Sequence, residues 1–82
     1  NHLYGIGHNI LSKHNLPFEL LQPLIQETAK KVQTINPSQA QTGPAKRGDQ
    51  KTIDKHLDLL GEGTASALYN VLTESIKEKY GS

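Results

Sequence analysis

Apolar side chains recur along the chain at intervals of three and four residues, which is the spacing of one face of an α-helix. Stretches rich in glycine, proline and polar residues separate four such segments. The predicted helices cover about residues 2–14, 17–35, 50–60 and 65–80. No segment alternates apolar and polar residues as a half-buried strand would. The pattern therefore predicts an all-α fold, a small helical bundle of about four helices.

The first two predicted helices contain residues that disfavour a regular helix. Gly5 and Gly7 each cost about 1 kcal/mol relative to alanine in a helix interior. They could let the backbone of another helix approach closely, or this end of the chain could fray. In the second helix, Pro23 removes a hydrogen bond to the carbonyl of Glu19. We therefore expect either a kink there or a separate turn over the first six residues, which begin at Pro17.

Residues 36–49 interrupt the helical pattern with two prolines, two glycines and several short polar side chains. The sequence predicts a long loop here, and loops of this length in small domains are usually functional or disordered. Asp49 suits the N-cap of the following helix, because its carboxylate can accept hydrogen bonds from the first amides of that helix. Gly61 fits the end of the same helix, and Thr64 fits the N-cap of the next.

Length and composition indicate one domain with a thin core. Eighty-two residues suit a single compact unit without a linker. Hydrophobic residues make up 34% of the chain and no cysteine can form a disulfide, so we expect self-association or docking on another domain. The chain starts at Asn1 without an initiator methionine and already within a helical pattern, which indicates a piece of a longer protein.

Charge and residue spacing argue against several partners. The net charge is +1 without a basic face, so no nucleic-acid partner is expected. No apolar run could span a membrane, and the absence of cysteine fits the cytoplasm. The four histidines are His2, His8, His14 and His56. None lies four residues from another, which is the spacing that places two imidazoles on one helical face, so no metal site is predicted.

The stretch from Gly43 to Asp49 has the chemistry of an anion site. Gly43 and Pro44 favour a turn, and Gly48 lets the backbone approach a ligand just before the free amides of a helix N-terminus, at residues 50–52. Arg47, next to Lys46, could bind a phosphate or carboxylate through two parallel hydrogen bonds. Asp49 would order the turn.

An ordinary charged loop is the alternative, in which Arg47 pairs with Asp49 or Asp54. One helical turn further on, Thr52 and His56 share a face because they lie four residues apart. His56 could contact a ligand held at the loop, or it could simply cover the core. The residues alone leave both alternatives open.

The string GPAKRGDQKTIDKHLDLL at residues 43–60 resembles the signature of a bacterial domain of unknown function. Eight positions fit that signature: Gly43, Pro44, Arg47, Gly48, Asp49, Thr52, His56 and Leu57. The segment LLQPLIQET around Pro23 also resembles the helix that precedes the loop in this family, so the likeness extends over about residues 15–80. Family members carry this domain after a Rossmann-like NADP-binding domain. They are oxidoreductases related to pyrroline-5-carboxylate reductase and the 6-phosphogluconate dehydrogenase superfamily.

The resemblance implies that residues 1–82 are the C-terminal domain of an NADP-dependent oxidoreductase, with a fold like the C-terminal domain of 6-phosphogluconate dehydrogenase. The N-terminal domain would bind most of the NADP, while this domain would supply a homodimer surface and residues facing a small-molecule substrate. The residues implied are His56 for catalysis and, for binding substrate or cofactor, Gly43, Pro44, Arg47, Gly48, Asp49 and Thr52. The alternative is a helical protein-interaction module with no catalytic role.

Overall fold

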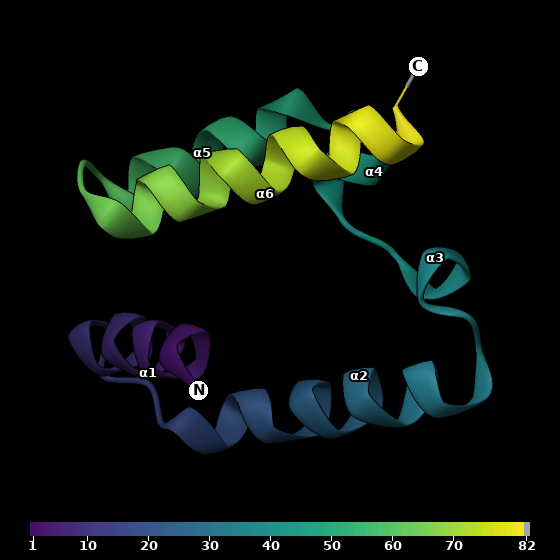
Figure 1. The fold of residues 1–82 in the computed structure, drawn as a ribbon. Helices are drawn as coiled ribbons and strands as arrows, with labels where there is room; N and C mark the ends of the chain where they lie inside the picture. The colour runs from purple at the N-terminus through teal and green to yellow at the C-terminus, as the bar shows by residue number, and fades with distance from the viewer. Residues whose placement is uncertain (82) are drawn as a thin grey trace. The chain divides into compact units, whose positions relative to one another are not determined.

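The computed structural model describes residues 1–81, and the regular elements within that range are all helices (Figure 1). The predicted all-α class is therefore confirmed. The described residues form two compact units, of which the first comprises Asn1–Ala40 and the second begins at Gln41. The single domain that the length of the chain predicts stays a prediction.

The first unit is built around a short 3-10 helix that contacts the two longer helices beside it. In chain order its elements are α1 (His2–Lys13), η1 (Phe18–Leu21), α2 (Gln22–Thr34) and α3 (Pro37–Ala40). A methyl group added at Gly7 would lie 3.3 Å from Cδ1 of Leu21, so this glycine allows a side chain of η1 to pack closely on α1. A methyl group at Gly5 would meet no atom within 4 Å, and packing gives no reason for a glycine there.

At Pro23 the sequence predicts either a kink or a separate preceding turn, and the structure has the separate turn. The residues before it form the separate turn η1, and Pro23 lies in the first turn of α2, where a missing N–H leaves no carbonyl without a partner. At the end of α1, Nδ1 of His14 lies 2.9 Å from the carbonyl oxygen of Ile10. Asn15 then adopts φ 57°, a left-handed conformation that asparagine tolerates better than most residues.

The second unit contains α4 (Pro44–Arg47), α5 (Gln50–Leu60) and α6 (Thr64–Tyr80). α5 and α6 lie side by side and run antiparallel, and α4 packs against both (Figure 1). The buried residues of this unit are Ala45, Ile53 and Thr73. Because each of the three helices provides one of them, the core of the unit lies where these helices meet.

The bounds of α5 agree with the prediction, from the cap at Asp49 to Gly61 just past its end. The long loop predicted over residues 36–49 is wrong in part, because it contains the single helical turns α3 and α4. Both turns begin at a proline, whose fixed φ suits the first residue of a helix.

The predicted N-cap of α6 is also wrong. Thr64 is the first residue of the helix itself, and Gly63 precedes it with φ 136°. Glycine adopts that angle readily because it lacks a Cβ atom, so the chain turns at Gly63 and the hydroxyl of Thr64 makes no capping hydrogen bond.

Candidate functional site

The segment that contains α4 and ends just before α5, which we call the elbow (residues 43–49), holds most of the predicted site residues. Gly43 precedes α4 with φ 106°, and Gly48 ends it with φ 70°. Both angles favour glycine, and a Cβ atom at either position would meet no atom within 4 Å. Glycine is therefore required at these positions by the backbone angle and not by a lack of space for a side chain. Pro44 begins α4. The shape of the elbow thus explains these three residues without a ligand.

Asp49 caps α5, as the sequence predicts. Its Oδ1 accepts a hydrogen bond from the amide of Thr52 at 3.1 Å, and its Oδ2 accepts one from the Thr52 hydroxyl at 2.7 Å. The hydroxyl and the amide of Thr52, with a smaller contribution from Arg47, hold the pKa of Asp49 below its usual range. The carboxylate is therefore ionised at neutral pH and fixed to the first turn of the helix.

Arg47 pairs with Asp49, as the ordinary-loop alternative expects. Its Nη2 lies 3.3 Å from Oδ2 of Asp49, and the arginine side chain remains 58% exposed. Asp54, the other carboxylate considered for this pair, accepts a hydrogen bond from Nε2 of Gln50 at 2.9 Å. Because a guanidinium carries five N–H donors, the contact with Asp49 leaves most of the Arg47 fork open to an anion.

The amides expected to be free at residues 50–52 are mostly occupied, and this part of the predicted anion site is wrong. The amide of Gln50 donates to the carbonyl of Gly48 at 3.1 Å, and the amide of Thr52 donates to Asp49. An N-cap carboxylate takes the place that an external anion would need. Side chains, and not the helix N-terminus, are therefore the groups that could bind an anion at the elbow.

His56 lies one turn beyond Thr52 on α5 and contacts α6. Its Nδ1 is 2.7 Å from the hydroxyl oxygen of Tyr69, and the two rings meet edge to face at 88° with centroids 5.6 Å apart. Burial raises the pKa of the Tyr69 hydroxyl, which keeps its proton and can donate it to Nδ1 of a neutral imidazole. In that neutral form the ring proton would lie on Nε2, which could donate a hydrogen bond to a ligand, whereas in the imidazolium form Nδ1 would donate to the Tyr69 oxygen.

Tyr69 is not among the residues that the sequence predicts for the site, although the chain contains a signal for it. In an antiparallel hairpin, residues at similar distances from the turn face each other. His56 lies five residues before Gly61, and Tyr69 lies six after Gly63. Lys77 also contacts α5, because its Nζ donates to Oε1 of Gln50 at 3.3 Å, but the distances of these two residues from the turn differ by three positions and do not predict the pair.

A pocket of about 400 Å³ opens between α4 and the C-terminal end of α6, and we call it the basic pocket. Its lining residues are Ala45, Lys46, Arg47, Gly48, Gln50, Lys77, Tyr80 and Gly81. Arg47 and Gly48 are the predicted site residues among them, whereas Thr52 and His56 do not line it. The structure thus divides the predicted site between the basic pocket, the Asp49 cap and the pair formed by His56 and Tyr69.

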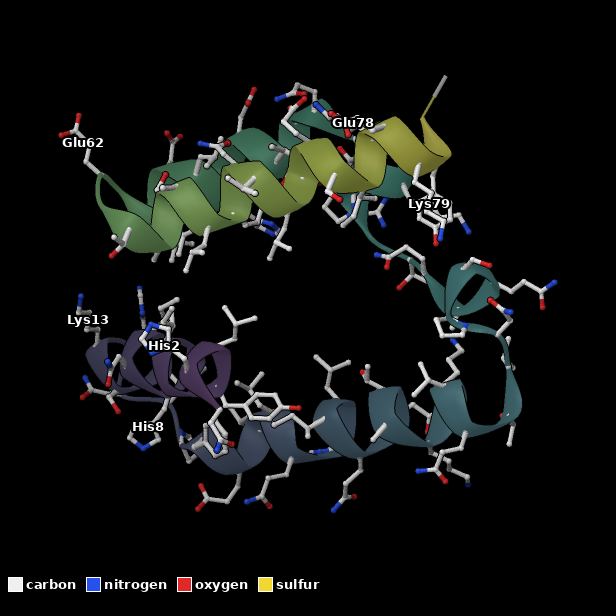
Figure 2. All side chains as sticks on the ribbon, viewed as in Figure 1. His2, His8, Lys13, Glu62, Glu78 and Lys79 are labelled. Atoms are coloured by element: carbon white, nitrogen blue, oxygen red, sulfur yellow. The ribbon has the colours of Figure 1, made fainter. Side chains whose placement is uncertain are left out.

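The first unit contains three of the four histidines. His2 and His8 lie on different sides of α1 (Figure 2). Among residues 1–81, no group of three or more His, Cys, Asp or Glu side chains is placed to hold a metal ion. Within the same range, every helix is too short or too polar to cross a bilayer.

Comparison with known proteins identifies a family and a similar solved structure. The sequence profile of a domain of unknown function, DUF2520, matches residues 1–76. No curated protein matches the chain. A crystal structure of a Bacteroides fragilis protein, described as a "putative NADP oxidoreductase", is similar with a TM-score of 0.88 and 47% sequence identity. The match covers 95% of this chain and only 30% of that protein.

Proposed function

The chain belongs to the DUF2520 family, and on this premise we propose that it is the C-terminal, substrate-side domain of an NADP-dependent oxidoreductase. The observation that carries the proposal is the similarity to an oxidoreductase over 95% of this chain but 30% of the longer protein. In the proposed arrangement, an N-terminal Rossmann-like domain of the same protein binds most of the NADP. The enzyme would act on a small molecule in the bacterial cytoplasm.

The described residues could supply only a small part of the contacts that bind NADP. A dinucleotide is held by a glycine-rich turn between a β-strand and a helix, and residues 1–81 contain no strand. NADPH supplies a hydride when it is bound, so the part left to this chain is to bind anionic groups and to provide a proton. Arg47 has the open guanidinium for the first task, and the imidazolium form of His56 would carry a transferable proton on Nε2 for the second.

We assign His56 the role of general acid. The acid would be the imidazolium form, in which Nδ1 donates to the Tyr69 hydroxyl oxygen, so that Tyr69 positions the ring, and Nε2 carries the proton that is transferred. Arg47 would bind the substrate or the cofactor, and Thr52 and Asp49 would hold Arg47 at the start of α5. Gly43, Pro44 and Gly48 would contribute by fixing the elbow.

A homodimer is the second part of the proposal. Four large apolar residues at and near α2 are exposed: Leu20 (58%), Leu24 (63%), Val32 (47%) and Ile35 (39%). Leu24 and Val32 lie eight residues apart on α2, a spacing that places them on one side of the helix, while Leu20 lies in η1 and Ile35 directly follows α2. Exposed apolar faces of this kind commonly mark surfaces that another subunit covers.

The test uses the full-length protein that contains this chain. We expect a strand and a glycine-rich turn within roughly 150 residues upstream, a typical domain length, and binding of NADPH measured by its fluorescence. NADPH oxidation is then followed with a panel of small ketones and imines. His56→Ala should lower turnover by roughly 100-fold or more without weakening NADPH binding, whereas His14→Ala, in the first unit, should change neither.

The exposed apolar residues also favour the alternative function, a helical interaction module that does no chemistry. On that alternative, the upstream sequence lacks the glycine-rich turn and the full-length protein does not bind NADPH. Either result would remove the oxidoreductase proposal and leave the interaction module.

A further inference from the structure

We propose that the basic pocket binds a phosphorylated small molecule through the side chains of Lys46, Arg47 and Lys77. The inference deepens the proposed function, on which it rests for the assignment of Arg47 to ligand binding. It adds the chemical class of the ligand and a residue, Lys77, that lies on a different helix and 30 positions from Arg47 in the sequence.

The distribution of charge is the first argument. The whole chain has nine Lys and Arg residues against eight Asp and Glu residues. In the part of the chain that the structure describes, three of those basic residues and none of the acidic ones line the pocket. Like charges gathered in this way repel one another, and an anion bound among them would relieve the repulsion.

The contacts of Arg47 and Lys77 leave both cations able to bind a ligand. Arg47 touches Asp49 through Nη2 alone, at 3.3 Å. Nζ of Lys77 lies 3.9 Å from Oε1 of Glu74, whose side chain is 69% exposed, so this ion pair is loose and strongly solvated. The closer partner of Lys77 is the neutral amide oxygen of Gln50.

Lys46 is held at the pocket by neutral groups. Its Nζ donates to the carbonyl of Gln41 at 3.0 Å and lies 5.3 Å from the centre of the Tyr80 ring. Lys79, at this end of α6 in Figure 2, lies 5.5 Å from the same ring centre. The Tyr80 ring gives the pocket a flat apolar wall, which suits the organic part of a ligand.

The charge and the size of the pocket favour a phosphate ester over a carboxylate. A phosphate ester carries a charge of about −1.5 to −2 at neutral pH and three strong acceptor oxygens, which matches three cationic side chains. A carboxylate has one charge and two oxygens, so it would leave two of the three positive charges unbalanced and one cation without an acceptor oxygen. The volume of about 400 Å³ lies in the range of small-molecule sites, so there is room for more than the phosphate group.

Isothermal titration calorimetry at low ionic strength tests the proposal, with pyrophosphate as the probe and malonate as the carboxylate comparison. We expect pyrophosphate to bind roughly tenfold or more tightly than malonate, and its affinity to fall as salt is added. Lys46→Gln and Lys77→Gln should each weaken pyrophosphate binding by roughly tenfold. Lys55→Gln is the matched control, because Lys55 lies on α5 and does not line the pocket. Circular dichroism shows that each variant is folded.

Three results would overturn the inference. They are the absence of pyrophosphate binding to the folded protein, malonate affinity equal to that of pyrophosphate, and a loss in Lys55→Gln as large as in Lys77→Gln. NADPH binding by the full-length protein is a separate measurement. If NADPH binds and pyrophosphate does not, only the pocket is refuted. If pyrophosphate binds and NADPH does not, only the oxidoreductase proposal fails.

Discussion

Asp49 connects the elbow to α5, because its two oxygens accept hydrogen bonds from Arg47 and from the amide and hydroxyl of Thr52. Asp49→Ala removes all three contacts, and we expect Tm to fall by roughly 4–8 °C, the size typical of a lost helix cap in a domain of this length. Asp49→Asn keeps an acceptor for the amide and should retain most of the Tm. Thermal unfolding followed by circular dichroism measures both variants, and an equal loss in the two would contradict the capping role.

The pH dependence of this contribution follows from the direction of the Asp49 pKa shift. Thr52 lowers the folded-state pKa below the ordinary value of 3.8. A carboxylate shifted in this direction stabilises the fold above its unfolded-state pKa, and the contribution disappears as the pH falls through the folded-state pKa. The Tm difference between the unchanged protein and Asp49→Ala should therefore be full at about pH 6 and shrink below about pH 4. A difference that stays constant down to about pH 2 would show that the carboxylate charge plays no part.

At the scale of the elements, two glycines give opposite expectations for the same substitution. Gly48→Ala places a side chain at φ 70° and should lower the free energy of unfolding by about 1–2 kcal/mol. Gly5→Ala, inside α1 with open space around it, should raise that free energy by about 0.5–1 kcal/mol. Urea unfolding of both variants measures the two values. Changes of the same sign would contradict the assignment of Gly48 to a backbone requirement.

The helices that the sequence predicts best are those with local signals at both ends. α5 has the predicted bounds because Asp49 and Gly61 act on the neighbouring backbone. α3 and α4 were not predicted because a single turn is too short to show an apolar repeat, and only the proline at its start marks it. At the start of α6, the hydroxyl of Thr64 suits a cap by composition, but the backbone angle of Gly63 determines where the helix begins.

The candidate site shows the same division between local and distant interactions. The contacts of Asp49 with Thr52 and Arg47 span three residues or fewer, and the sequence predicts both as possibilities. The partners of His56 and Gln50 on α6 lie 13 and 27 residues away. Those pairs depend on the register between α5 and α6. The register follows from the length of the turn and from the packing of the two helices, and no short sequence motif specifies it.

At the scale of the whole molecule, self-association is the expectation that follows from the exposed apolar face of α2. Sedimentation of the protein at tens of micromolar should show a dimer, and Leu24→Glu should weaken it because a carboxylate would be buried against an apolar partner. Gln26→Glu adds the same charge to an exposed polar position of that helix and should leave the dimer intact. A cooperatively folded monomer would show that self-association is not needed for stability.

The carboxylate of Asp49 is shared between an arginine of the basic pocket and an amide of α5. An anion that draws Arg47 away removes one of the donors that compete for this carboxylate, so its hydrogen bond with the Thr52 amide becomes stronger. Exchange of that amide with deuterium should then slow when the pocket is filled. By thermodynamic reciprocity, substitutions that stabilise the first turn of α5 should raise the affinity of the basic pocket for its ligand. The start of one helix would thus report, through a single backbone proton, whether a neighbouring site is occupied.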